Sequence, residues 1–431
     1  MLCAFLVVGG LYSIGTNFYQ IRGFREWIGS TLFSPRVKKN MRITDKTMSP
    51  FQTFATAMAS SVGTGNIAGV ATALVLGGPG AVFWMWISAL LGMMTIFAEN
   101  ALGIKYRYKT TTGEWLGGAF IYIKQGLGMK LPATIYLIFC ILASFGIGNA
   151  VQSNSVADAL QYSFDVPPLF TGIVLTSISA IVIFGGMKSV ARTNEKIVPF
   201  MIIGYILGGV YCIISNFSLL PEAIALIFKE ALYPKSALGG TIGYGISRSM
   251  RYGIARGVFS NEAGIGTSAL ANSFTCDNDP IKQGMWGIFQ VFTDTIVVCS
   301  ITALAILTSG VFELGSTSIT GTALASKSFT ATLGSFGGIF VSISTIFFAF
   351  ATIIAWSLFG SKCVDYLLGE KMASLYKKVY TLFIFWGAVS SLELVWQVTE
   401  ALNGLMAIPN LIALILLSPQ VFRMFKDYPR L

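Results

Sequence analysis

An uncharged stretch from Met48 to Gly78 constrains this chain most, because it is long enough to cross a bilayer core as a helix. Its centre, Ser60 to Gly69, holds three glycines, two serines, a threonine and an asparagine. Each glycine lowers helix propensity by roughly 1 kcal/mol relative to alanine, and an unpaired amide in hydrocarbon costs several kcal/mol more. Two interpretations are open. The stretch is either a broken helix whose exposed backbone binds a ligand, or a small-residue contact between helices at Gly65 and Gly69.

The composition of the whole chain indicates a membrane protein. Apolar residues make up 54% and charged residues 11%, whereas roughly 25% of residues are charged in a soluble domain. We therefore expect an all-α polytopic membrane protein with about eleven transmembrane helices and no separate soluble domain. The apolar spans are 1–18, 48–76, 79–104, 131–162, 167–187, 197–218, 219–247, 281–310, 334–360, 376–392 and 393–418.

The basic residues predict the orientation of these spans. All of the 29 lysines and arginines follow odd-numbered spans except Lys229, Lys235 and Lys327. The positive-inside rule then places the N-terminus outside and the C-terminus in the cytoplasm of a multi-pass cell-membrane protein. The net charge of +10 is thus a topology signal, and nucleic-acid binding is not expected.

The sequence lacks the residue patterns of an enzyme. It contains no histidine, and its six cysteines lie mostly inside apolar spans, which is typical of small core residues rather than a zinc site. No nucleophile–base pair or phosphate-binding loop is evident. We therefore predict no catalytic residues, no enzymatic activity and no organic cofactor.

The stretch 219–247 is a second irregular span. Its first part is helical in pattern, and Leu232 to Ser236 then interrupts it with a proline. Gly239, Gly240 and Thr241 follow. Proline and glycine together within a span indicate a discontinuous helix.

These two broken spans each open a group of five spans, which predicts inverted repeats with a binding site between them. The expected organisation is a single transmembrane domain. It comprises an extra helix and cytoplasmic linker (1–47), a first repeat (48–218), a second repeat (219–418) and a cytoplasmic tail (419–431).

Two further polar features stand out. The segment Arg256 to Gly264 is predicted to be a polar cytoplasmic gate or turn rather than a substrate site. Asp294 is the lone acid well inside its span, and an intramembrane carboxylate is a functional candidate by default.

An unwound helix at residues 59–66 would offer two kinds of ligand. Bare amides at Thr64, Gly65 and Asn66 would bind a carboxylate, as the N-terminus of a half-helix does. Bare carbonyls at Ala59, Ser61 and Val62 would hold a small hard cation. Thr352 is another oxygen donor at depth, although a hydrogen bond to its own backbone is an equal alternative. A site of this kind suits a small zwitterion.

The segments Gly63 to Gly69 and Gly77 to Trp86 closely resemble the signature of the alanine/glycine:cation symporters, which are also called sodium:alanine symporters. Supporting matches cover nearly the whole chain in family order. The resemblance implies a LeuT-like fold, with a 5+5 inverted repeat after one extra helix. It also implies sodium-coupled, in some members proton-coupled, uptake of alanine, glycine or a related neutral amino acid. The supporting matches are Gln152–Ser155, Val198–Met201, Arg256–Gly264 and Leu405–Leu411.

The resemblance further implies roles for individual residues. Thr64 and Gly65 would meet the substrate carboxylate, with Asn66 close to it and to a sodium ion. Trp356 would bound the side-chain end of the pocket, and Thr352 would join Ala59 and Val62 in a second sodium site. The remaining pocket residues would be Gln152, Gly239, Gly240 and Thr241.

The sequence departs from the expected family pattern at four positions. Ala351 stands where a serine is usual, which removes a hydroxyl from the second sodium site. Gln290 replaces an expected glutamate, and Thr267 and Asn272 replace serine and histidine. These departures leave open whether the ion coupling is altered.

The leading hypothesis is a sodium symporter for alanine or glycine in the lipid bilayer. The alternatives are a proton-coupled or ion-independent amino-acid carrier, which Ala351 favours, and a membrane sensor that binds an amino acid without transporting it. The sequence does not specify an oligomeric state.

Overall fold

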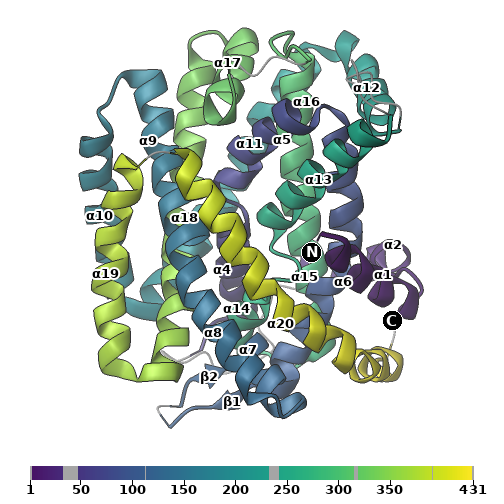
Figure 1. The fold of residues 1–431 in the computed structure, drawn as a ribbon, viewed down its shortest axis with the longest axis vertical. Coiled ribbons are helices and arrows are strands. Elements are labelled where there is room, and N and C mark those ends of the chain that lie inside the picture. The colour runs from purple at the N-terminus through teal and green to yellow at the C-terminus, as the bar shows by residue number, and fades with distance from the viewer. Residues whose placement is uncertain are drawn as a thin grey trace.

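The computed structural model describes residues 2–32, 47–111, 113–232, 242–314, 319–390 and 392–429, and these are almost entirely helical. Most helices run along the long axis of the molecule, and a short hairpin of β1 (Tyr108–Lys109) and β2 (Trp115–Leu116) lies at one end (Figure 1). The first part of the chain forms α1 (Leu2–Gly15), α2 (Tyr19–Arg22), α3 (Phe24–Thr31), α4 (Pro50–Ser61), η1 (Thr64–Asn66), α5 (Ala68–Gly77), α6 (Gly80–Tyr106), α7 (Ala119–Ile121), η2 (Tyr122–Gly126), α8 (Lys130–Phe145), η3 (Gly146–Ala150), α9 (Val151–Phe164), α10 (Pro168–Phe184) and α11 (Gly186–Ser215). The second part forms η4 (Phe217–Leu219), α12 (Leu220–Leu232), α13 (Ile242–Asn261), α14 (Thr267–Ser273), α15 (Pro280–Val291), η5 (Phe292–Cys299), α16 (Ser300–Thr308), α17 (Gly321–Leu333), α18 (Phe336–Leu368), α19 (Glu370–Val389) and α20 (Leu392–Asp427).

Within the described ranges, six segments are long and apolar enough to cross a membrane, and shorter apolar helices accompany them. One of the six joins α8, η3 and α9 into a continuous segment from Lys130 to Phe164. The helices α11 and α20 differ from the predicted spans, since α11 begins at Gly186 and α20 continues to Asp427. The predicted kink site at Pro409 lies inside α20.

The predicted break in the first irregular span is present. Helix α4 begins with a capping box, in which Ser49 and Gln52 each accept a hydrogen bond from the other's backbone N–H. It ends at Ser61 because Val62 (φ −75°, ψ 88°) and Gly63 (φ −128°, ψ −155°) leave the helical region. The chain then forms the single turn η1 before α5 resumes.

The described residues contain a further break, which was not expected from the sequence. The expected interruption at 232–243 largely falls on residues 233–241, which lie outside the described part of the chain. The described discontinuity within the second repeat separates α13 from α14, at residues 262–266. Glu262 there has a φ of 58°, and Gly264 and Gly266 both have φ values of +91°, so the helix cannot continue through them.

This position corrects the assignment of Arg256–Gly264 as a cytoplasmic gate or turn. The segment leads directly into the buried second break, and Ser260, Asn261 and Glu262 are at most 1% exposed. The sequence suggested a cytoplasmic loop because α13 contains several arginines, which are typical of such loops.

The same helix corrects part of the charge argument. Ser249 donates a hydrogen bond to the Gly77 carbonyl, and Arg248 donates to the Leu76 carbonyl. The start of α13 therefore lies at the end of the molecule that carries the Gly77–Gly80 turn. The prediction had placed that turn outside and Arg248 inside, and these two assignments are incompatible. The predicted span 219–247 combined α12 with the start of α13. The basic residues that follow it were therefore assigned to the wrong side of the membrane.

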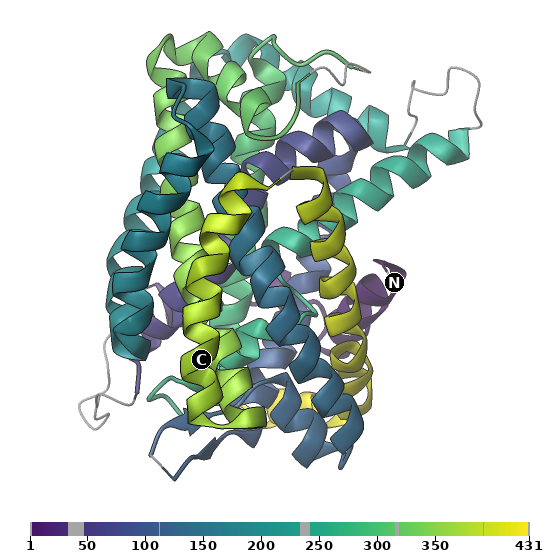
Figure 2. The same cartoon turned by 60° about the vertical axis from the view of Figure 1, so that its left-hand side comes forward.

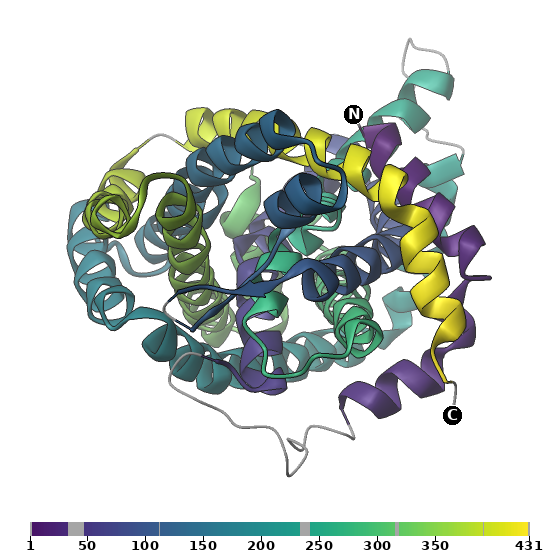
Figure 3. The ribbon, with the colours of Figure 1, turned by 90° about the horizontal axis from the view of Figure 1, so that it is seen from below.

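The two broken helices lie at the centre of the molecule. Helix α4 packs against α11 and α18, and α13 packs against α5 and α6. The helices α10 and α19 form one outer edge (Figures 1 and 2), and the extra N-terminal helices lie at the opposite rim, where α1 contacts α6 and α20 (Figure 3). The helix α17 packs against α5 and α18.

Arg107 ties together the loops at the hairpin end. Its buried guanidinium donates to the carbonyls of Ser273, Thr275 and Asp277 at 2.6–2.8 Å. Burial lowers the pKa of Arg107 to about 10, so the group stays charged at neutral pH. Met48 pairs with Thr275 in an isolated bridge, which links the beginning of α4 to the end of α14.

Candidate functional site

The first break presents amides and a hydroxyl group to the interior. The Thr64 N–H donates to Gln152 Oε1 at 3.1 Å, and the Gly63 N–H donates to Asn66 Oδ1 at 3.0 Å. Two side-chain carbonyl oxygens thus occupy amides that would suit a carboxylate. Thr64 is 0% exposed, and its Oγ1 has no hydrogen-bond partner in the described part of the chain. A buried unpaired hydroxyl is uncommon and points to a missing ligand or water.

A π-helical turn positions Gln152. The segment η3 precedes α9, and Gln152 Nε2 donates to the Ile147 carbonyl at 2.9 Å. Within η3, a Cβ added to Gly148 would lie 2.3 Å from the Cβ of Trp356. The glycine therefore lets α18 approach closely, and it brings Gln152 and Trp356 to the same region. Such π-helical turns are frequent at functional sites.

Asn66 joins the two repeats through Asp294. Its Nδ2 donates to Asp294 Oδ1 at 2.8 Å and to the Asp294 carbonyl at 3.1 Å. The other carboxylate oxygen, Oδ2, accepts from Ser260 at 2.9 Å and from Thr295 at 2.7 Å. Asp294 is 0% exposed and lies in the π-helical η5. This intramembrane acid thus has the partner that its depth requires.

A second buried carboxylate, Glu262, lies at the other break. Ser60 Oγ donates to Glu262 Oε2 at 3.1 Å, Thr267 Oγ1 donates to the same oxygen at 2.6 Å, and Trp356 Nε1 donates to Oε1 at 3.0 Å. The sequence analysis did not assign Glu262 to the site. The run from Ser260 to Gly266 combines polar residues and glycines as Ser60 to Gly65 does, and this similarity could have revealed it.

The residues expected to bind sodium fall into two groups. Thr352 Oγ1 donates to the Ala59 carbonyl at 2.8 Å, and a Cβ on Gly63 would lie 2.8 Å from Thr352 Oγ1. Thr352 Oγ1 also lies 2.9 Å from the Phe348 carbonyl of its own helix, as the alternative interpretation of this hydroxyl expects. Asn66 instead faces Asp294.

The hydroxyl of Ser61 faces a different neighbour, since it accepts from Gln290 Nε2 at 3.3 Å. Gln290 also accepts from Ser268 and donates to the Ala57 carbonyl. This glutamine, which stands where the family resemblance implies glutamate, bridges α4, α14 and α15. The predicted pocket residues Gly239, Gly240 and Thr241 lie outside the described residues.

Two buried carboxyl groups, Glu262 and Asp294, lie in the site. Among the described residues, the donors to Glu262 and Asp294 are neutral amide, hydroxyl and indole groups. Buried charges are costly unless they are paired. The described residues contain no group of three or more histidine, cysteine or acidic side chains arranged for a metal ion. The arrangement therefore suits small monovalent cations or an ammonium group, held by separate carboxylates and carbonyls.

The family described as "Sodium:alanine symporter family" matches residues 1–431. The chain belongs to the sodium:alanine symporter family.

Curated relatives of this family member span most of its length. The sodium/alanine symporter AgcS of Methanococcus maripaludis is 46% identical over 376 residues, which cover 86% of this chain and 82% of the relative. The putative sodium/proton-dependent alanine carrier protein YrbD of Bacillus subtilis is 38% identical, and the match covers 99% of this chain and 88% of the relative. The probable sodium/glutamine symporter GlnT of the same organism is 36% identical, and the match covers 100% of this chain and 88% of the relative.

Solved structures with little sequence similarity share the fold. A sodium-coupled sialic acid symporter in an outward-open state superimposes with a TM-score of 0.58 at 15% identity, over 96% of this chain and 85% of its own. The nucleobase-cation symporter Mhp1 superimposes with a TM-score of 0.52 at 13% identity, over 90% of this chain and 79% of the Mhp1 chain. This sodium:alanine symporter family member is thus a multi-pass, helical transmembrane transporter with a LeuT-like fold.

Proposed function

We propose that this family member is a secondary active transporter that carries alanine or glycine into the cell together with sodium by alternating access. The observation that carries the proposal is the unpaired, fully buried Thr64 hydroxyl beside the amides of Gly63 and Thr64. The substrate carboxylate would displace the side-chain oxygens of Gln152 and Asn66 from these amides. The names of AgcS and YrbD support alanine as the substrate.

The two buried carboxylates would supply the negative charge for the cations. Asp294, bonded to Asn66, would bind a sodium ion, and Glu262 at the second break would face the substrate ammonium group. The zwitterion would then lie between the two breaks, with its carboxylate on the first and its ammonium on the second. A second sodium would lie at the Ala59 and Val62 carbonyls and Thr352, with Ser61 contributing only its carbonyl.

Sodium coupling is energetically sufficient. One monovalent cation that enters down a tenfold gradient yields about 1.4 kcal/mol, and a potential of 100 mV adds roughly 2.3 kcal/mol. Their sum of about 3.7 kcal/mol would support accumulation on the order of 500-fold at one ion per neutral solute. We expect the N-terminus outside and the C-terminus in the cytoplasm, as the remaining basic residues favour.

The test is uptake of radiolabelled alanine into proteoliposomes with an imposed sodium gradient, and again with potassium in place of sodium. We expect uptake only with sodium, and loss of at least about tenfold in Asn66→Ala, because that side chain joins the first break to Asp294. Asn216→Ala, at the end of α11, is the matched control and should transport normally. Binding of alanine without flux under any gradient would reject the transporter in favour of a sensor.

A proton-coupled carrier is the second candidate, and one observation favours it. Ala351 carries no hydroxyl beside Thr352, while two carboxylates that could carry protons lie in the site. Equal uptake in sodium and potassium, driven by an inward proton gradient, would support this alternative. A return of sodium dependence in Ala351→Ser would then identify the cause.

A further inference from the structure

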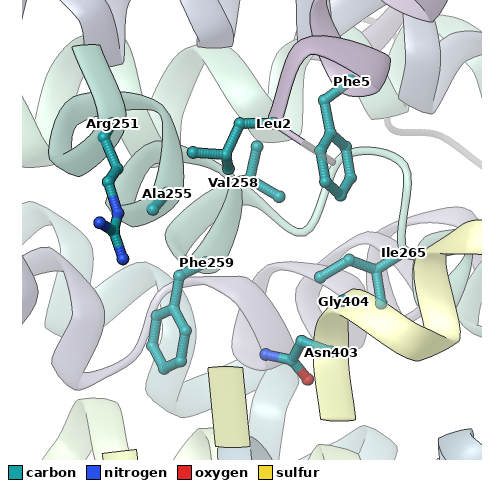
Figure 4. Close-up of a pocket in the computed structure, with 9 residues that line it drawn as sticks. All are labelled: Leu2, Phe5, Arg251, Ala255, Val258, Phe259, Ile265, Asn403 and Gly404. Atoms are coloured by element: carbon teal, nitrogen blue, oxygen red, sulfur yellow. The ribbon is translucent and has the colours of Figure 1, made fainter. Parts of the chain in front are cut away.

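A separate pocket of about 200 Å³ lies between α1, α13 and α20 (Figure 4). Phe5 of α1 and Ile265 of the second break lie on one side of it, and Arg251 and Phe259 of α13 lie on the other. Phe259 also contacts the candidate site, because a Cβ added to Gly65 would lie 3.1 Å from its ring. The pocket and the site are therefore separated by one aromatic side chain.

The polar groups of this pocket are suited to an anion. Asn403 of α20 is 7% exposed, and neither its Nδ2 nor its Oδ1 has a hydrogen-bond partner in the described part of the chain. A buried amide without partners costs free energy unless a ligand or water satisfies it. Arg251 supplies a positive charge at the exposed side of the pocket, and no lining residue is acidic. An ammonium group would find no carboxylate there.

The rest of the lining is apolar and limits the size of the occupant. Besides Arg251 and Asn403, the lining side chains are aliphatic or aromatic, together with one glycine. A cavity of about 150 Å³ lined by apolar residues binds benzene, so this pocket has room for a slightly larger molecule. A molecule with a hydrocarbon body and one anionic head group would match both the apolar lining and the positive charge of Arg251.

We propose that this pocket binds a small apolar monocarboxylate, with the carboxylate at Arg251 and Asn403 and the hydrocarbon against Phe5, Val258 and Ile265. A bound molecule would pack on Phe259 and Ile265, which flank the second break. It would stabilise the conformation in which Phe259 covers Gly65, and it would thereby slow substrate exchange without competing for the substrate site. This regulatory step rests on the proposed transport function, whereas the binding step does not.

Binding is tested first, on purified protein in lipid nanodiscs, by isothermal titration with 3-phenylpropionate. Three matched compounds share its skeleton: 3-phenylpropan-1-ol has no charge, 3-phenylpropylamine is a cation, and phenylalanine is a zwitterion. We expect the carboxylate to bind at least about tenfold more tightly than the others. Oleate is a further arm, and its binding at the same site would identify bilayer fatty acid as the source of the same chemistry.

Two variants locate the ligand. Arg251→Gln should weaken binding about three- to tenfold, as expected for a partly exposed charge pair. Ala255→Phe should fill the pocket and abolish binding. Arg192→Gln, an exposed arginine on α11, is the matched control and should bind normally. Unchanged binding in both Arg251→Gln and Ala255→Phe, or displacement of the ligand by alanine, would overturn the proposal.

Transport then tests the regulatory step. The carboxylate should lower the maximal rate of alanine uptake and leave the apparent affinity for alanine unchanged, and Arg251→Gln should relieve this inhibition while keeping normal uptake. Binding without inhibition would limit the proposal to a ligand site and reject its regulatory part. An absence of alanine flux in all preparations would reject the proposed function and leave the binding result standing.

Discussion

At the scale of single residues, the proposed function depends on the hydroxyl group of Thr64. Most buried hydroxyls here bond to a carbonyl of their own helix, as Thr345 does with Val341. Thr64 Oγ1 has no such partner in the described part of the chain. The hydroxyl therefore forms no hydrogen bond that would stabilise the fold in the absence of ligand. It lies beside backbone amides that suit a carboxylate, so binding of the substrate explains its position best.

Thr64→Val should therefore separate binding from stability. We expect alanine affinity to fall about tenfold, since a hydrogen bond to a charged group is worth roughly 1.5–3 kcal/mol. The thermal unfolding temperature without ligand should not fall. Equilibrium binding of radiolabelled alanine and a thermal melt provide the two readouts. Thr345→Val is the control, and a loss of affinity of the same size there would contradict the assignment.

The proposed second sodium site depends on two neighbouring residues, Thr352 and Ala351. Thr352 contacts the Ala59 carbonyl, so Thr352→Val should raise the sodium concentration needed for half-maximal uptake by about tenfold. Ala351→Ser should lower it, because it adds an oxygen where the family resemblance implies one. Sodium titration of uptake measures both. Identical sodium dependence in all three proteins would remove this site from the mechanism.

At the scale of elements, close packing between η3 and α18 holds the site together. A Cβ on Gly148 would lie 2.3 Å from Trp356 Cβ, whereas a Cβ on Gly204 of α11 would have no heavy atom within 4 Å. Both glycines lie in helical segments. The two positions thus differ in packing, and Gly148 also lies in a π-helical turn whereas Gly204 lies in an α-helix.

Gly148→Ala should destabilise the protein by about 1–3 kcal/mol through overpacking and should impair alanine binding. Gly204→Ala should be neutral or stabilise by up to about 1 kcal/mol, because alanine has the higher helix propensity. Unfolding in a graded denaturant–detergent mixture compares the two. Equal effects at both positions would show that the approach of α18 does not constrain the site.

Arg107 connects elements that no local pattern links. It bonds the carbonyls of Ser273, Thr275 and Asp277 in the segment after α14. Arg107→Met should leave these acceptors unsatisfied and cost about 3 kcal/mol. Amide hydrogen exchange in residues 273–278 should rise, and Arg22→Met, which changes an exposed arginine, should leave it unchanged. Unaltered exchange in Arg107→Met would show that the bridge at Met48 alone holds this segment.

At the scale of the whole molecule, the proposed site brings together residues that are far apart in the chain. Glu262 and Asp294 come from the second repeat, and their donors Ser60 and Asn66 come from the first. Cations that bind there would stabilise the arrangement of both repeats, because a ligand that binds the folded state adds free energy by mass action.

Sodium should therefore raise the melting temperature by at least about 2 °C relative to equal ionic strength of choline. Alanine should add a further increase only when sodium is present. Asp294→Asn should remove the sodium effect, and Glu262→Gln should chiefly remove the alanine effect. A sodium effect that persists in Asp294→Asn at full size would place the ion elsewhere.

The sequence by itself determined the class of protein and the first half of the site. Low charge, apolar spans and the glycine-rich run at Ser60–Gly69 indicate a helical membrane protein with a broken helix, because backbone in hydrocarbon must be satisfied locally. These are local properties, and the structure confirms the break at residues 62–67. The family resemblance was equally local, since it rested on contiguous segments.

The tertiary structure alone decided the second half of the site. Proline and glycine at 232–243 gave a stronger local signal than Glu262 to Gly266, whose importance depends on burial against Ser60 and Trp356. Those partners are roughly 200 and 100 residues away in the chain, and no periodicity records such contacts. The same holds for the pairing of Asn66 with Asp294. A buried carboxylate acquires its function from the donors that packing brings to it, and only the folded chain brings these together.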